Sequence, residues 1–197
     1  MDFKKFLPWI IGAVVIIGIY SWASGIYNNA MTFEQGVKES WGNVNTTYQK
    51  RNDLIPNLVS TVKGYAEHEK GTLTAVIEAR AKATAITIDP TNITPEQLAA
   101  FNSAQSGVSS SLSRLLVSVE QYPNIKADQS FLKLQDELTS IENQILTART
   151  RFNEAVKPYN NNILTFPRNI FANMYGLKEK PYFEASTGAE KPAEVKF

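Results

Sequence analysis

The chain has 197 residues and a formal net charge of +1, with 20 Lys and Arg against 19 Asp and Glu. This balance gives no electrostatic case for a nucleic-acid partner, because nucleic-acid-binding proteins usually show a basic excess or stripe. The sequence contains no cysteine, which excludes disulfides, zinc fingers, thiol nucleophiles and a lipoprotein-type cysteine anchor.

The N-terminal segment has the composition of a membrane span. Residues 6–33 carry no formal charge, and residues 7–27 reach the roughly 20 apolar positions that cross a hydrocarbon core. Trp9 and Trp22 stand near the two ends, where interfacial aromatic side chains concentrate. We therefore predict an N-terminal flank at residues 1–6 and a transmembrane helix at residues 7–27, with the lipid bilayer as a partner.

The charges around this segment bear on whether it is cleaved as a signal peptide and on how it is oriented in the membrane. Lys4 and Lys5, followed by an apolar run that ends at Ala23, also fit a cleaved signal peptide. If the segment is a span, two lysines precede it and only Lys38 follows within about fifteen residues. The positive-inside rule then predicts a cytoplasmic N-terminus and a bundle outside the cytoplasm.

The rest of the chain is predicted to be helical. Apolar residues recur every three or four positions in three segments, which predicts an all-α domain, an antiparallel bundle or coiled coil of three long helices. A short aromatic helix is expected to follow, and the C-terminal tail is expected to be disordered. The expected ranges are residues 28–183 for the whole bundle, 30–88, 95–122 and 129–165 for the long helices, 168–175 for the short helix and 184–197 for the tail.

Capping signals mark the helix ends. Thr94 is the expected N-cap of the second helix, with Pro95 in its first turn and Gln97 completing a capping box. Asp128 can cap the third helix. Gly176 is expected at the C′ position of the short helix.

Two prolines fall inside the predicted helices. Pro56 and Pro158 each remove one helical hydrogen bond, which frees the carbonyls of Asn52 and Glu154. Because the apolar seam keeps its phase through Pro56, we predict helix kinks at both prolines rather than breaks. Such a kink is either a bend that wraps the bundle or a functional hinge.

A series of short motifs runs through the region from about residue 27 to residue 183. The motifs are R-N-D-L-I-P-N-L (51–58), S-R-L-L (113–116), E-Q-Y-P (120–123), F-L-K-L-Q-D-E-L (131–138), A-R-T-R-F-N (148–153), P-Y-N (158–160), F-P (166–167) and Y-F (182–183). In this order they strongly resemble the LemA family. The resemblance implies a bacterial membrane protein with one N-terminal span and an antiparallel helical bundle, and it implies no activity or catalytic residues. In some members the short N-terminus lies outside the cell, which is opposite to the orientation that the lysines predict.

Residues with catalytic or metal-binding potential are scarce. His68 is the only histidine, and its neighbours Glu67 and Glu69 point away from it on a helix. The serines of residues 106–113 lie in a predicted helix without a nucleophile elbow, and carboxylates such as Glu137 are scattered at helical spacings. We therefore expect no catalytic residues, no metal and no cofactor, and we predict that the protein is not an enzyme.

Five polar residues near the seams form a candidate structural network. Buried charges must be paired, and polar residues at seam positions can fix helix register. Ligand binding is the alternative role for the same set. The residues are Arg51, Asp53, Arg114, Arg149 and Asn153.

The predicted helix lengths also indicate a candidate oligomer interface. A first helix of about 88 Å would extend far beyond a second helix of about 42 Å. The membrane-proximal seam of the first helix would then lack a partner within the chain, and an exposed apolar patch of that kind usually marks an interface. The alternative is that the first helix breaks at Pro56 or Gly64 and folds back. The seam residues are Val37, Trp41, Val44 and Tyr48.

Together these features predict a membrane-anchored, non-enzymatic helical scaffold or adaptor of the bacterial cell envelope, located in the cytoplasmic (inner) membrane. We expect it to form a homo-oligomer and to bind unidentified envelope proteins through the seam and the aromatic C-terminal segment. The alternative is a membrane-tethered binding module that recognises a small ligand or peptide between helices. A hydrolase is the least supported interpretation.

Overall fold

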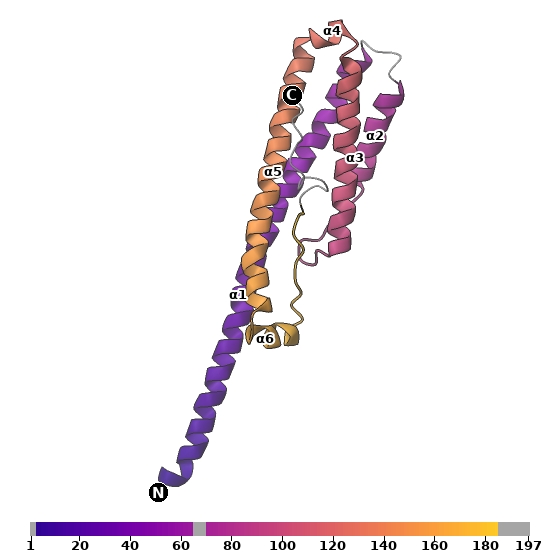
Figure 1. The fold of residues 1–197 in the computed structure, drawn as a ribbon. Helices are drawn as coiled ribbons and strands as arrows, with labels where there is room; N and C mark the ends of the chain where they lie inside the picture. Colours follow the sequence, from indigo (N-terminus) through magenta and orange to yellow (C-terminus); the bar gives the residue numbers. More distant parts are fainter. Residues whose placement is uncertain (1–2, 65–69, 185–197) are drawn as a thin grey trace, which may run out of the picture.

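The computed structural model describes residues 3–64 and 70–184, with side chains from Phe6 onward. All regular structure in this part of the chain is helical (Figure 1), so the all-α prediction is confirmed. His68 and the predicted tail beyond Glu184 lie outside the described residues. The helices are α1 (Phe3–Lys63), α2 (Lys70–Thr84), α3 (Pro95–Val119), α4 (Pro123–Lys126), α5 (Gln129–Leu164) and α6 (Arg168–Met174).

The first part of α1 protrudes from the bundle (Figure 1). Every side chain from residue 6 to residue 22 is exposed, and Ile16 is exposed by 68%. By length and composition, α1 is the one helix in the described part of the chain that could cross a membrane. Ala23 and Ile26 are already buried, so bundle packing begins within the last turns of the span predicted at residues 7–27.

The chain reverses direction after α1, which ends at Lys63. The predicted continuous helix over about residues 30–88 is therefore wrong, and the alternative of a break at Gly64 is confirmed. Beyond residues 65–69, α2 returns beside α1 and α3 (Figure 1). The bundle thus has four main helices instead of three, with α2 and α5 antiparallel to α1 and α3 parallel to it.

The contact between α2 and α1 uses the carbonyl that Pro56 leaves free. Pro56 has no N–H to donate to the carbonyl of Asn52, yet α1 continues through it. Arg80 of α2 donates instead, with 2.8 Å between its Nε and the Asn52 oxygen. α5 likewise continues through Pro158, so both prolines interrupt helical hydrogen bonding without ending the helix.

The predicted capping signals are confirmed. The N–H of Gln97 donates to Thr94 Oγ1 at 3.2 Å, and the N–H of Thr94 donates to Gln97 Oε1 at 3.1 Å. At the start of α5, the Asp128 carboxylate accepts from the N–H of Phe131 at 2.9 Å. These local interactions fix where α3 and α5 begin.

The core consists of two apolar clusters stacked along the bundle. The lower cluster lies toward the protruding part of α1, and the distal cluster lies toward α4. The lower cluster includes Val37, Trp41, Val44, Tyr48, Phe101, Ile145, Phe152, Tyr159 and Phe183. The distal cluster includes Ile55, Leu58, Val62, Leu73, Val76, Val108, Leu115, Ile125 and Phe131.

The seam predicted as an oligomer interface belongs to the lower cluster. Val37 and Val44 are fully buried within one chain, and Trp41 and Tyr48 are 5% and 4% exposed. The Trp41 ring lies 5.3 Å from the ring of Phe101 in α3. The prediction of an intermolecular seam is wrong because the reversal near Gly64 lets α3 begin at this level, and because α5 is long enough to run past it.

Replacing Trp41 by Ala should destabilise the single chain. Removing a large aromatic side chain from a core costs about 3–5 kcal/mol, so the urea midpoint of the detergent-solubilised protein, followed by circular dichroism, should fall at every protein concentration. Leu146→Ala is the control, because Leu146 is 61% exposed and should change stability by less than about 0.5 kcal/mol. If the decrease in the urea midpoint became larger on dilution, the seam would be an intermolecular contact after all.

Candidate functional site

Within the described residues, the site with the most polar contacts is built by the extended segment at residues 177–184, here called the strap. After α6, Gly176 adopts a left-handed φ of 69°, and the chain runs back along the bundle antiparallel to α5 (Figure 1). The N–H of Gly176 donates to the carbonyl of Asn173 at 3.1 Å, and that of Leu177 donates to Ala172 at 3.0 Å. This is the Schellman pattern, which confirms the predicted C′ glycine.

Two asparagines of α5 bind the strap through paired backbone-type hydrogen bonds. Asn153 donates to the carbonyl of Phe183 at 2.9 Å and accepts from its N–H at 2.8 Å. Asn160 makes the same pair with Lys180, at 2.8 and 3.0 Å. Seven helical residues rise about 10.5 Å and three extended residues cover about 10 Å, so both pairs form at once. We call Asn153 and Asn160 the amide strip.

Lys180 connects the strap to three other elements. Its side chain is 4% exposed, and its Nζ lies 3.2 Å from Glu34 Oε1 of α1. The same ammonium donates to the carbonyl of Thr91, between α2 and α3, at 2.8 Å. It also lies 5.1 Å from the centre of the Tyr159 ring of α5. Lysine is almost never fully buried without a partner, and here a carboxylate, a carbonyl and an aromatic face compensate its charge.

A pocket of about 360 Å³ opens beside this lysine. Burial raises the pKa of Tyr159 to about 12, and the nearby Glu34 carboxylate acts in the same direction. Near neutral pH the pocket therefore offers a neutral phenol beside an ion pair that is already satisfied within the chain. Here and elsewhere in the described residues, no group of three or more His, Asp or Glu could hold a metal ion.

The far end of the strap inserts Phe183 into the lower cluster. Phe183 is 6% exposed, and its ring stacks on Trp41 at 6.1 Å with 11° between the planes. Phe152 meets it edge-on at 5.3 Å. Arg149 covers the outer side, with its guanidinium carbon 4.7 Å from the ring centre and Nη2 donating to the carbonyl of Glu184 at 3.1 Å.

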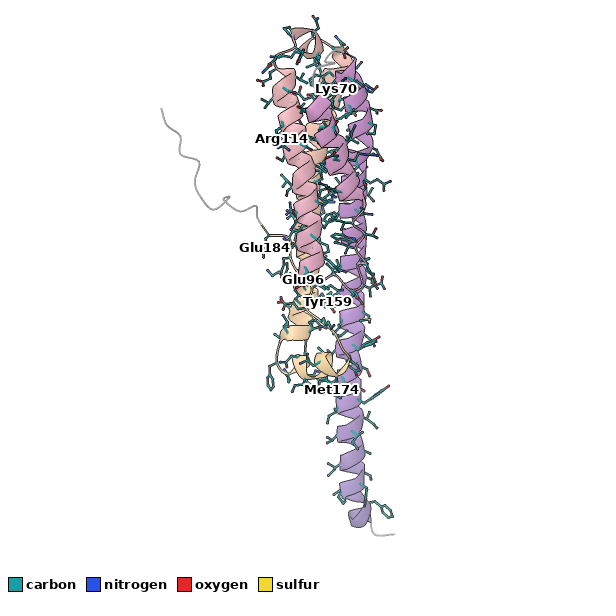
Figure 2. The ribbon with its side chains drawn as sticks, turned by 90° about the vertical axis from the view of Figure 1, so that its right-hand side faces the viewer. Lys70, Glu96, Arg114, Tyr159, Met174 and Glu184 are labelled. Atoms are coloured by element: carbon teal, nitrogen blue, oxygen red, sulfur yellow. The ribbon has the colours of Figure 1, made fainter. Side chains whose placement is uncertain are left out.

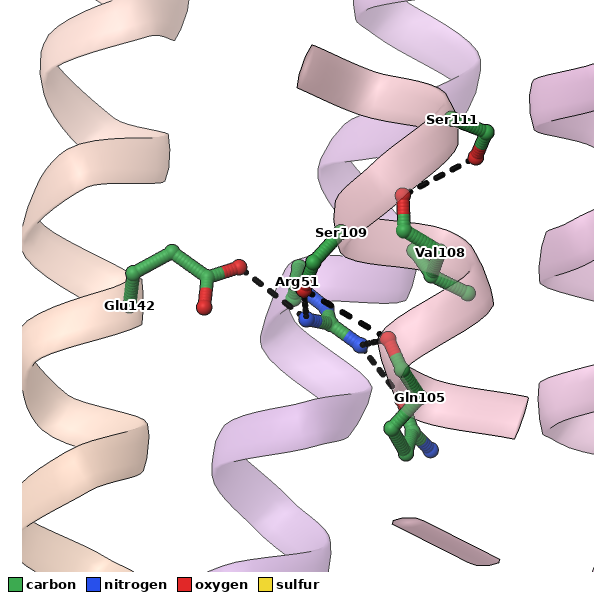
Figure 3. Close-up of polar contacts among 6 residues, drawn as sticks. All are labelled: Arg51, Gln105, Val108, Ser109, Ser111 and Glu142. Carbon is green, nitrogen blue, oxygen red and sulfur yellow. Dashed lines mark hydrogen bonds and ion pairs between the residues drawn. The ribbon is translucent and has the colours of Figure 1, made fainter. Parts of the chain in front are cut away.

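A second polar site lies where the two apolar clusters meet. Arg51 is 1% exposed, and its Nη1 lies 2.8 Å from Ser109 Oγ and 3.0 Å from Glu142 Oε1 (Figure 3). Its Nη2 donates to both oxygens of Gln105. The guanidinium also lies over the ring of Tyr48 at 5.1 Å, and burial raises the pKa of the Tyr48 hydroxyl. One charge thus joins α1, α3 and α5.

The five residues predicted as one network are separated in the structure. Arg51 lies in the mid-bundle site, Arg149 and Asn153 bind the strap, and Asp53 and Arg114 are exposed. The prediction of a single network is therefore wrong. Residues two apart on a helix do not face each other, which places Asp53 away from the partners of Arg51.

Several residues of both sites were not singled out from the sequence. Glu34 and Gln105 carry no local signal, because their partners lie far away along the chain. Asn153 was predicted as part of the network, whereas Asn160, seven positions further along the same helix face, was not. That spacing is the one signal that could have indicated the amide strip.

Comparison with known proteins identifies a family and several relatives. A family model described as the LemA family matches residues 40–197. Magnetosome proteins MamQ 1 and MamQ 2 of Paramagnetospirillum magneticum are each 26% identical over 183 residues, covering 84% of this chain and 67% of theirs. Protein LemA of Metamycoplasma hominis is 25% identical over 184 residues, covering 93% of this chain and 80% of its own.

Replacing Asn160 by Ala should loosen the strap. The N–H and carbonyl of Lys180 would lose their partners in a buried setting, which costs about 1–3 kcal/mol. Hydrogen exchange followed by mass spectrometry should then be faster in the peptide that covers residues 177–184. Asn161→Ala is the matched control, because the side chain of Asn161 is exposed. Unchanged exchange in Asn160→Ala would show that side-chain contacts alone hold the strap.

Proposed function

The chain belongs to the LemA family, and from that premise we propose that it is a membrane-anchored, non-enzymatic helical scaffold of the bacterial cell envelope. The observation that carries this proposal is the continuity of α1 from the exposed apolar stretch at residues 6–22 into the buried core. Apolar surface left in water costs roughly 25 cal/mol per Å², and lipid hydrocarbon would remove that cost. A bundle joined to its anchor by an unbroken helix would be held at a fixed height above the bilayer.

The non-enzymatic part of the proposal rests on how the buried polar groups are used. Among the described residues, the buried cations are Arg51 and Lys180, and each is paired with a carboxylate and a carbonyl of the same chain. The asparagines of the amide strip are likewise occupied by the strap. The names of the relatives give a family or a cellular structure and no reaction, which fits a protein that positions others.

A binding module for extended peptides is the second candidate. The amide strip already binds one extended segment through backbone-type hydrogen bonds, so a partner peptide could use the same groups if the strap left. We favour the scaffold because the strap is covalently attached to the chain and buries Phe183. Self-association stays a prediction, and anchored copies would have to meet through surfaces other than the buried seam.

An arginine at Val15 should weaken membrane association. A charge at the centre of a span disfavours insertion by about 3 kcal/mol on translocon scales, so the Val15→Arg variant should shift from the membrane fraction toward the soluble fraction of a cell lysate. Envelope proteins that copurify with the wild type after cross-linking should be lost with this variant. A wild-type protein that fractionates as soluble would contradict the anchor and the scaffold together.

We further propose the cytoplasmic membrane as the location, with the bundle on its outer side, from the lysines that precede the span. The chain has no cysteine, so Ser106→Cys on the exposed face of α3 would be its single thiol. It should react with a membrane-impermeant maleimide in intact cells, after permeabilisation of an outer membrane where the cell has one. Labelling only after lysis of the inner membrane would reverse the topology.

A further inference from the structure

The base of the bundle exposes large apolar side chains that the described part of the chain does not cover. Phe166 is exposed by 80%, Met174 by 76% and Ile170 by 50%. They are spaced four residues apart, so Ile170 and Met174 share one face of α6, and Phe166 precedes α6 by the same interval. We call these three residues the foot.

Ring contacts with α1 hold the foot in place. Phe171 meets Trp22 edge-on at 5.2 Å, and Tyr175 lies 5.1 Å from Tyr27. Ala172 on the inner side of α6 is 1% exposed. α6 therefore lies beside α1 at the base of the bundle (Figure 1). Its inner side is packed at Ala172, and the side that carries the foot is exposed.

Hydrogen bonds through Asn162 of α5 also hold α6 at this position along α1. Asn162 donates from Nδ2 to the carbonyl of Ile26 in α1 at 3.1 Å, and its Oδ1 accepts from Arg168 Nη1 at 3.3 Å. Asn162 is 3% exposed. The ends of α5 and α6 are thus tied to α1 one turn beyond Trp22, which sets the height of the foot along α1.

That height coincides with the end of the apolar stretch of α1. Residues 6–22 are exposed and cover about 26 Å at helical rise, close to the thickness of a hydrocarbon core. Trp22 ends this stretch, as interfacial aromatic side chains do, and the ring of Phe171 in α6 packs against it. Figure 2 shows Met174 at the base of the bundle, beside the point where α1 emerges.

The charges around the foot suit a lipid surface. From Leu164 to Leu177 the sequence contains one charged residue, Arg168, and its side chain is exposed. No carboxylate in this stretch would repel anionic headgroups, and the guanidinium could pair with a phosphate. Apolar side chains beside a cation are the composition of elements that lie in a membrane interface.

We propose that the foot inserts into the interfacial layer of the leaflet from which α1 emerges, so that the protein contacts the bilayer at two places. The partner is a phospholipid surface. This inference rests on the proposed anchor, and its basis is the continuity of the foot with the end of the span through Trp22 and Tyr27. The second contact fixes the tilt of the bundle, which a single helix would leave free.

Single-cysteine variants of the full chain test this proposal. The chain has no native cysteine, so Met174→Cys can carry an environment-sensitive nitrobenzoxadiazole label. The labelled protein is reconstituted into vesicles of phosphatidylcholine and phosphatidylglycerol that contain nitroxide-labelled lipids. We expect blue-shifted emission at residue 174 and quenching by nitroxides placed near the headgroups, several-fold stronger than for a label at Gln121, near α4.

Two further positions separate the outcomes. Asn173→Cys is the matched control, because Asn173 is exposed and lies one helical step of about 100° from Met174; we expect weaker quenching there. Val15→Cys reports the anchor and should be quenched by nitroxides deep in the acyl chains. If the label at position 174 is quenched no more than the label at position 121, while the label at position 15 is quenched, the proposal that the foot inserts into lipid is wrong and the anchor is unaffected.

The remaining outcomes of the quenching experiment also test the proposal. If the label at Val15 is not quenched, both the anchor and the foot fail. Disulfide-linked dimers of the unlabelled Met174→Cys variant, combined with an unquenched label at the same position, would show that a second copy covers the foot and would overturn the lipid assignment. Since Met174 and Val15 are exposed in the fold, these variants should keep the helical circular dichroism of the wild type.

Discussion

The guanidinium of Arg51 is the constraint around which the bundle is arranged. Taking a charge out of water costs several kcal/mol unless partners compensate it, and here the partners come from α3 and α5 together. The lower cluster ends at Tyr48 and the distal cluster begins at Ile55, on either side of the charge. α1, α3 and α5 therefore have one mutual register in which the arginine is paired and both clusters are closed.

The apolar core of the lower half of the bundle is completed by the strap as well as by the helices. α1, α3 and α5 supply Trp41, Phe101 and Phe152, and the strap supplies Phe183, whose ring stacks on Trp41. The strap reaches that position because the Schellman turn at Gly176 sends the chain back from α6. α6 thus serves two purposes, since it redirects the chain into the core and presents apolar side chains at the base.

Local features of the fold could be predicted, and long-range ones could not. The capping box of Thr94 and the glycine cap at residue 176 depend on neighbours within a few positions, so their residue types were sufficient. The reversal near Gly64 was ambiguous because Val62 in α1 and Val76 in α2 are both buried in one cluster, and the apolar period continues across the break. The burial of Lys180 depends on Glu34, 146 positions away, which no local pattern reveals.

The amide strip makes the strap sensitive to length more than to composition. The seven-residue step from Asn153 to Asn160 in α5 and the three-residue step from Lys180 to Phe183 in the strap have nearly equal lengths, about 10.5 and 10 Å. The two lengths match only at this spacing. One residue inserted between Lys180 and Phe183 would displace one end by about 3.3 Å, so either an amide pair or the buried phenylalanine would lose its place. An outward residue such as Tyr182, which is 39% exposed, could be exchanged without altering the match. Most surface segments tolerate changes in length, whereas we expect the strap to tolerate substitutions only when the spacing between Lys180 and Phe183 is kept.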